Sequence, residues 1–209
     1  MKRSYQKMRY NNTYRTESTR LQGWDYGEPG LYYVTICTKN MQNWFGEIVN
    51  DKTALNAIGK IVKKEWLRTA NIRENIELDE WIIMPNHLHG IIWIKHEIDV
   101  ETTRGVVSNQ LANKAFQRNV STTIKPNSLG SIIGQFKSIC TKRIRLLDPT
   151  FAWQSRFYDH IIRDEHGLEN IRRYIANNPL NWKIDHIDND TKFIKQLSMS
   201  TKMQSLQIN

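Results

Sequence analysis

The sequence predicts an α+β fold in which helices pack on an antiparallel sheet. Four short segments with alternating or β-branched and aromatic residues predict strands, at 31–38, 76–84, 87–95 and 157–162. Segments in which apolar residues recur at helical spacing lie between or after them. The chain has 209 residues, which is enough for one domain with a single sizeable core.

The first part of the chain begins with a polar, basic arm over residues 1–22, which lacks hydrophobic periodicity. The strand at 31–38 follows, and 44–49 has the pattern of a short flap strand. A helix is expected next, with Asn50 and Asp51 as cap residues ahead of it. Its apolar face consists of Leu55, Ile58, Val62, Trp66 and Leu67.

The second part begins with the strands at 76–84 and 87–95, which are expected to pair as a β-hairpin. Residues 97–127 are polar and aperiodic, which indicates an insertion or linker. Ser128 opens a helix whose buried side includes Ile132 and Phe136. The last strand, 157–162, leads to a helix that Asp164 caps and Pro179 is expected to stop. Residues 184–209 form a polar tail.

The element order is therefore β-α-β-β-α-β-α. A split β-α-β arrangement of four strands and two helices predicts a ferredoxin-like sandwich with an antiparallel sheet. The domain is expected to span residues 23–183. Two helices would cover one face of the sheet, and the final helix would lie across the other.

The pattern with the most chemical content is His87-Leu88-His89, which is flanked by apolar strand residues. Residues i and i+2 of a strand point to the same face, so the two imidazoles would lie side by side. Leu88 would anchor the strand in the core behind them. Paired neutral imidazoles on a rigid strand are suited to a divalent cation.

Together with two further segments, this motif resembles a known family. The segments are Leu78-Asp79-Glu80-Trp81 with Met84-Pro85-Asn86-His87-Leu88-His89-Gly90, and the stretch from Phe151 through Arg172-Arg173-Tyr174-Ile175-Ala176-Asn177-Asn178-Pro179. The resemblance is to the REP-associated tyrosine transposases, which are single-tyrosine HUH transposases of small bacterial insertion sequences. It covers roughly residues 23–182.

The resemblance implies a set of roles. Tyr174 on the final helix would attack a DNA phosphorus, and His87, His89 and Asn178 would ligate Mg²⁺ or Mn²⁺. Tyr174 and Asn178 are four residues apart, so they share one helix face. The product would be a 5′-phosphotyrosyl bond and a free 3′-OH. Tyr158 is a rival nucleophile, and His160 is either a DNA contact or a core residue.

The charge balance favours a polyanionic partner. The chain has 30 Lys and Arg against 21 Asp and Glu, a formal net charge of +9. The family implies single-stranded DNA with hairpins as the partner. Phosphate contacts are expected from Arg3, Lys7, Arg9, Lys137, Lys142, Arg143, Arg145 and Arg172. The helix residues among these could instead form a solvated face.

Other features limit the class of protein. Cys37 and Cys140 have no metal-binding spacing and are expected to be small core residues. The sequence shows no signal peptide and no apolar run long enough to span a bilayer, which favours the cytoplasm. The function expected is a metal-dependent DNA endonuclease and strand transferase. The alternatives are a non-catalytic nucleic-acid-binding protein of ferredoxin-like fold and a hydrolase of small phosphoesters.

Overall fold

The computed structural model describes residues 9–10, 13–14, 21, 23–96 and 126–182. The core is a four-stranded sheet with the order β6-β7-β3-β8, in which all neighbouring strands are antiparallel. The strands are β3 (Gly30–Cys37), β6 (Ile76–Ile83), β7 (His87–Ile94) and β8 (Tyr158–Ile162). The helices are α1 (Ala57–Asn71), α2 (Leu129–Ile144) and α3 (Glu165–Asn181). This confirms the predicted ferredoxin-like α+β fold.

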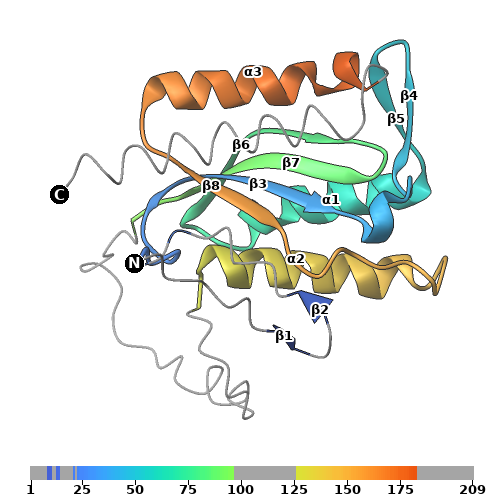
Figure 1. Ribbon diagram of the computed structural model, residues 1–209, viewed down its shortest axis with the longest axis horizontal. Helices are drawn as coiled ribbons and strands as arrows, with labels where there is room; N and C mark the ends of the chain where they lie inside the picture. Colours follow the sequence, from blue (N-terminus) through green and yellow to red (C-terminus); the bar gives the residue numbers. More distant parts are fainter. Residues whose placement is uncertain (1–8, 11–12, 15–20, 22, 97–125, 183–209) are drawn as a thin grey trace, which may run out of the picture.

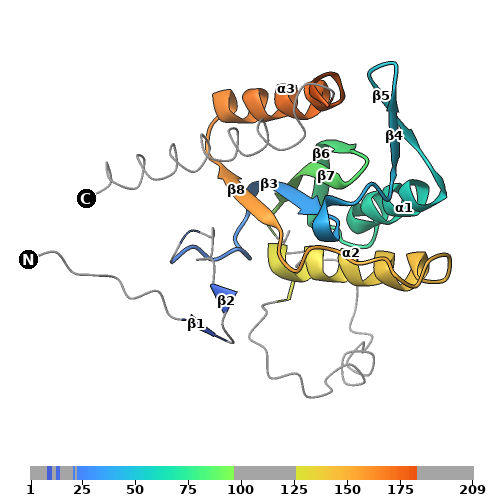
Figure 2. The same cartoon turned by 45° about the vertical axis from the view of Figure 1, so that its right-hand side comes forward.

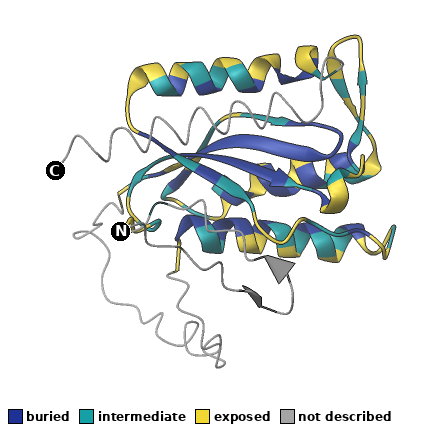
Figure 3. Cartoon of the chain, viewed as in Figure 1, coloured by how far each residue is buried: buried dark blue, intermediate teal, exposed yellow. Residues whose placement is uncertain are grey.

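The sheet lies between two helical layers (Figures 1 and 2). Helices α1 and α2 cover one face, where Trp66 and Phe136 pack with Val34 and Leu88. Helix α3 covers the other face, where Ile171 and Ile175 are buried in a second cluster with strand residues. Figure 3 shows that the inner strands β3 and β7 and the inward faces of the helices are mostly buried. The predicted place of the final helix is therefore confirmed.

A glycine in β7 brings α1 close to the sheet. A Cβ atom at Gly90 would lie 2.4 Å from Cζ2 of Trp66, which is fully buried. Any side chain at this position would therefore displace the largest ring of the core. The same alternation that turns Gly90 and Leu88 toward α1 and α2 turns His87 and His89 toward α3.

Two local predictions were wrong. Asn50 and Asp51 do not cap α1; they form the turn of a β-hairpin between β4 (Gly46–Val49) and β5 (Lys52–Leu55). Their φ angles of 50° and 57° match a two-residue turn, which Asn and Asp tolerate. The N-cap of α1 is Asn56, whose side chain accepts a hydrogen bond from the Gly59 amide at 2.9 Å.

Pro179 does not stop α3, which continues to Asn181. A proline costs the helix one backbone hydrogen bond, and it lies here in the final turn, where few such bonds remain to be made. By contrast, Ser128 and Asp164 cap α2 and α3 as predicted.

The remaining elements are the 3₁₀ turn η1 (Lys39–Met41) and the two-residue strands β1 (Arg9–Tyr10) and β2 (Thr13–Tyr14). Three predicted segments fall largely outside the described residues. These are most of the arm at 1–22, most of the insertion at 97–127 and all of the tail at 184–209. Within the described part of the chain, none of the helices has the length and apolar character that crossing a bilayer requires.

Candidate active site

The two histidines of β7 lie side by side on the sheet face beneath α3. Their ring centroids are 4.4 Å apart. His87 is 1% exposed and His89 is 0% exposed. Leu88 between them is buried in the core on the opposite face, as the alternation predicts. Because β7 is an inner strand, paired on both sides, the backbone that presents the imidazoles is rigid.

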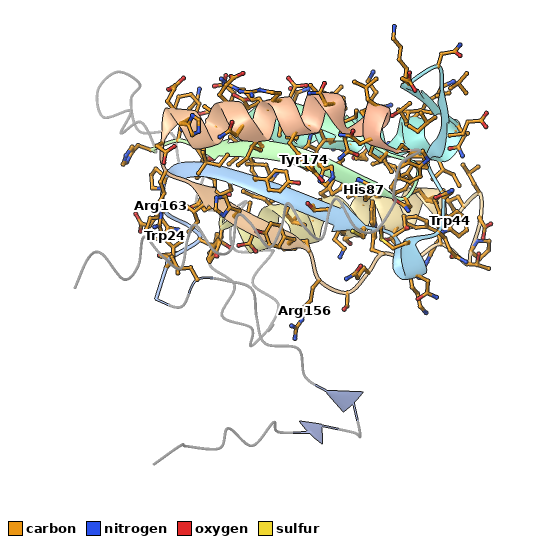
Figure 4. The ribbon with its side chains drawn as sticks, turned by 45° about the horizontal axis from the view of Figure 1, so that its top comes forward. Trp24, Trp44, His87, Arg156, Arg163 and Tyr174 are labelled. Carbon is orange, nitrogen blue, oxygen red and sulfur yellow. The ribbon has the colours of Figure 1, made fainter. Side chains whose placement is uncertain are left out.

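Tyr174 of α3 lies over this pair. Its ring centroid is 5.4 Å from that of His89, and it is half-buried. In Figure 4 the Tyr174 side chain lies beneath α3, near His87. Two turns further along the helix, the ring of Trp182 is 6.1 Å from that of His87. The face of α3 that carries residues 174 and 182 therefore follows the histidine pair.

Asn178 lies on this helix face, four residues from Tyr174 and four from Trp182, and its side chain is buried. One helix thus brings together the sequence-predicted nucleophile and the sequence-predicted third ligand. Among the described residues, no group of three or more His, Cys, Asp or Glu gathers as a metal site. The role of Asn178 as a ligand stays a prediction.

Side chains of β3 and of the β6–β7 turn hold the imidazoles. The Nδ1 atom of His89 is 2.8 Å from the Tyr33 hydroxyl and 2.9 Å from the Thr35 hydroxyl. The Nδ1 atom of His87 is 2.7 Å from Oδ1 of Asn86. Sequence reasoning missed all three residues as parts of the site. Tyr33 and Thr35 are two residues apart on a strand, so the sequence does predict that they share one face. Only the pairing of β3 with β7 shows that this face is the one that carries His89.

Two further titratable groups lie on the same sheet face. Burial, and then the charge of Asp159, raise the pKa of Tyr158 well above its usual range. A raised pKa makes the phenol harder to ionise, so it does not favour Tyr158 as a nucleophile. Burial, with a smaller effect of Arg163, lowers the pKa of His160 to about 4. His160 is therefore neutral at physiological pH, and it is only partly buried.

The eight predicted DNA-binding residues differ in their surroundings. Four of them contact the protein itself: Arg172 pairs with Asp79, Arg143 with Glu65, Lys137 donates to the Gln154 carbonyl, and Arg145 to the Phe151 carbonyl. Lys142 is exposed. Arg3 and Lys7 lie outside the described residues, and Arg9 lies in β1. DNA contacts by these side chains stay a prediction.

An open groove of about 490 Å³ lies between α2 and the segment that leads to β8. Lys137 and Arg145 contribute to its lining, and none of the described residues that line it is acidic. Trp153 and Phe157 add aromatic surface, which sequence reasoning did not assign to DNA. This segment lies beside the end of β3 at which Cys37 is paired with His87. Trp153 forms a β-bridge with Thr38, and the Gln154 amide donates to the Cys37 carbonyl at 2.9 Å.

Comparison with known proteins places this geometry in context. No protein-family model matches the chain. A protein of Haemophilus influenzae, named only as uncharacterized, is 38% identical over 171 residues, which cover 81% of this chain and 91% of the relative. The chain belongs to the same family as this Haemophilus protein. The name of that relative states no activity, so this kinship by itself assigns no function.

The fold of this chain has a solved counterpart. The structure of a REP-associated tyrosine transposase bound to a REP hairpin superposes with a TM-score of 0.50 at 16% sequence identity. The match covers 79% of this chain and 74% of the transposase. The fold of this chain is therefore transposase-like, which agrees with the resemblance found in its motifs.

Proposed function

We propose that this protein is a metal-dependent endonuclease and strand transferase, a transposase, that acts on single-stranded DNA with hairpins. The observation that carries the proposal is the proximity of three rings. The ring centroid of His89 is 5.4 Å from that of Tyr174 and 4.4 Å from that of His87. A nucleophile next to two candidate ligands suits attack on a polarised phosphodiester. The hairpin bound to the transposase of similar fold supports the substrate class.

The proposed reaction conserves the phosphodiester energy. The Tyr174 oxygen attacks phosphorus and loses its proton, while the bond from phosphorus to the 3′ oxygen breaks. The leaving oxygen takes a proton and becomes a free 3′-OH. The new bond is a 5′-phosphotyrosine, and no water is consumed. Attack by another 3′-OH on this bond would rejoin DNA and regenerate the tyrosine.

The residues present fit a divalent cation. His87, His89 and Asn178 would hold it, and all three are buried on the face between β7 and α3. When bound, the cation supplies Lewis-acid polarisation of the phosphate. Imidazole suits transition metals better than it suits Mg²⁺, so this donor set favours Mn²⁺ over Mg²⁺.

The groove on α2 is a candidate path for single-stranded DNA near the histidine end of the sheet. It adjoins the end of β3, where Cys37 is opposite His87 in the strand register. Cationic and aromatic side chains in one groove are the means by which proteins hold single-stranded DNA. A strand bound there has to pass only this end of the sheet to approach Tyr174.

A single experiment tests the nucleophile. A single-stranded oligonucleotide that contains a hairpin from the DNA flanking the gene is labelled at its 3′ or its 5′ end and incubated with protein and Mn²⁺. We expect a covalent protein–DNA adduct that contains only the 3′ label, because the tyrosine joins the 5′ phosphate. Tyr174→Phe is expected to abolish the adduct and keep DNA affinity, since only the attacking oxygen is removed.

Tyr158→Phe is the matched control, because it removes a hydroxyl from the other tyrosine on this face. It should retain the adduct. An adduct that persists in Tyr174→Phe and disappears in Tyr158→Phe would assign the nucleophile to Tyr158. EDTA, His87→Ala and His89→Ala should each abolish cleavage, and undiminished cleavage in EDTA would contradict the metal role.

The burial of the histidines favours the second candidate function, a non-catalytic nucleic-acid-binding protein. With exposures of 1% and 0%, the two imidazoles are closed to a phosphate in this conformation. Under this alternative, the wild-type protein binds the oligonucleotide but forms no adduct at any Mn²⁺ concentration. The same gels therefore distinguish the two functions.

A further inference from the structure

Asn86, which immediately precedes His87, is held at both ends of its side-chain amide. Its Oδ1 is 2.7 Å from Nδ1 of His87, and its Nδ2 donates to the Met41 carbonyl at 3.1 Å. A carbonyl can only accept a hydrogen bond, so the amide nitrogen has to face Met41. The amide oxygen consequently faces His87. Asn86 is 4% exposed, which protects both contacts from competition by water.

The orientation of this amide determines where the proton of His87 resides. An amide oxygen can only accept, so Nδ1 of His87 has to carry hydrogen and donate it. In a neutral imidazole the other nitrogen, Nε2, then has the lone pair. In free histidine the opposite tautomer is favoured, so the protein has to impose this one.

The loop that supplies the Met41 carbonyl has an unusual backbone conformation. Asn40 and Met41 both have left-handed backbones, with φ of 56° and 53°. Asn tolerates this region, but a methionine there is strained. The backbone of Asn86 is held as well, because its carbonyl accepts from the amide and the hydroxyl of Thr38, each at 2.9 Å.

We propose that Asn86 is a positioning residue that holds His87 as the Nδ1–H tautomer and so selects Nε2 as the metal-ligating atom. The inference rests on the proposed function for its purpose, but not for the tautomer itself. The second imidazole also has protein partners at Nδ1, but these are hydroxyl groups, which can donate as well as accept. The hydroxyl groups of Tyr33 and Thr35 lie 2.8 Å and 2.9 Å from Nδ1 of His89, so the proposal on the tautomer is made for His87 alone.

The tautomer can be read in the metal-free protein by long-range ¹H–¹⁵N NMR of the imidazole nitrogens, at a pH of about 8 where an ordinary histidine is neutral. The signals of His87 are assigned by their disappearance in His87→Gln. We expect the wild-type spectrum to show Nδ1 protonated. Asn86→Ala should shift His87 toward the Nε2–H form, because the acceptor is gone. Asn86→Asp should keep Nδ1 protonated, because a carboxylate also accepts.

Asn43→Ala, which removes an exposed amide from the same loop region, is the control and should leave the spectrum unchanged. An Nε2–H spectrum in the wild type, or an Nδ1–H spectrum that persists in Asn86→Ala, would overturn the proposal. If Asn86→Ala does not fold, Asn86→Ser replaces it, because the serine side chain is too short for its oxygen to reach Nδ1. The wild-type spectrum remains a test in either case.

Mn²⁺ affinity, measured by titration calorimetry, provides the second readout. Removal of a group that orients a ligand typically weakens metal binding 10- to 100-fold, so Asn86→Ala should raise the Mn²⁺ dissociation constant by about that factor. Asn86→Asp should recover most of the affinity. A wild-type protein with the expected tautomer but no affinity for Mn²⁺ would contradict the proposed metal chemistry and leave the Asn86 assignment standing.

Discussion

Asn178 lies between Tyr174 and Trp182 on the helix face that covers the two histidines. A buried amide in the last turn of a helix has two interpretations. It can satisfy the end of the helix, or it can offer its oxygen to a cation between α3 and β7. The two interpretations differ in whether its removal changes the metal dependence of cleavage.

Asn178→Ala is expected to slow cleavage and to raise the Mn²⁺ concentration that supports half-maximal rate by about 10-fold or more, because one ligand is removed. High Mn²⁺ should recover part of the rate, since two imidazoles still bind metal weakly. Asn178→Asp should retain more activity than Asn178→Ala, because a carboxylate is also an oxygen ligand. Cleavage rate measured against Mn²⁺ concentration checks both.

The neighbouring Asn177 provides the control, because it is exposed on the other side of the same helix turn. Asn177→Ala should leave the Mn²⁺ midpoint unchanged. A common midpoint for wild type and Asn178→Ala would mean that Asn178 only completes the helix end.

At the scale of secondary-structure elements, an ion pair fastens α3 to the edge strand β6. Arg172 contacts Asp79 with two hydrogen bonds, 2.8 Å from Nε to Oδ1 and 2.5 Å from Nη2 to Oδ2. The hydrogen bond from Arg172 is the largest of the effects that hold the pKa of Asp79 below its usual value. Because α3 carries Tyr174, this pair helps to set the position of the candidate nucleophile.

Asp79→Asn is expected to destabilise the protein at neutral pH by about 0.5–1 kcal/mol, the usual size for a partly exposed pair. A carboxylate whose pKa is lowered in the folded state stabilises that state above its unfolded pKa of about 3.9. This contribution disappears as the pH falls through the lower, folded pKa. The difference in urea unfolding free energy between wild type and Asp79→Asn should therefore shrink below a pH of about 4.

Glu80→Gln removes an exposed carboxylate at the next position and serves as the control. It should change the unfolding free energy little at either pH. An Asp79→Asn difference that is equal at neutral and acid pH would show that the ion pair is not its source.

At the scale of the whole molecule, the net charge of +9 is unevenly distributed along the chain. Residues 1–20 contain Lys2, Arg3, Lys7, Arg9, Arg15 and Arg20 against the one acid Glu17. Residues 184–209 contain three lysines and three aspartates, so their formal net charge is zero. The N-terminal arm is therefore expected to contribute to the binding of a polyanion, and the C-terminal tail is not.

Deletion of residues 1–20 should weaken binding to the DNA hairpin and flatten its salt dependence. The slope of log affinity against log salt should fall by about 0.7–0.9 for each phosphate that the arm neutralises in the wild type. Deletion of 184–209 is the control of equal kind and should leave the slope unchanged. Binding measured over a range of salt concentrations checks both, and equal slopes for wild type and the 1–20 deletion would remove the arm from the DNA interface.

Local patterns were sufficient to predict much of this protein. The strand at β7 and the shared face of His87 and His89 follow from alternation of apolar residues. The caps at Ser128 and Asp164 follow from short side chains that satisfy helix amides. The same local reasoning failed at Asn50 and Asp51, since these residue types suit both a helix cap and a left-handed turn, and only the pairing of β4 with β5 distinguishes the two.

The sequence by itself determined the order of the four core strands and the three helices, the histidine spacing and the four-residue separation of Tyr174 from Asn178, because each depends on the periodicity of one strand or one helix. Only the tertiary structure decided which distant residues meet. Tyr33 reaches His89 across 56 positions, Asn86 reaches Met41 across 45, and Arg172 reaches Asp79 across 93. Such contacts depend on strand register and helix placement, which arise from packing of the whole core and not from the pattern of any single segment.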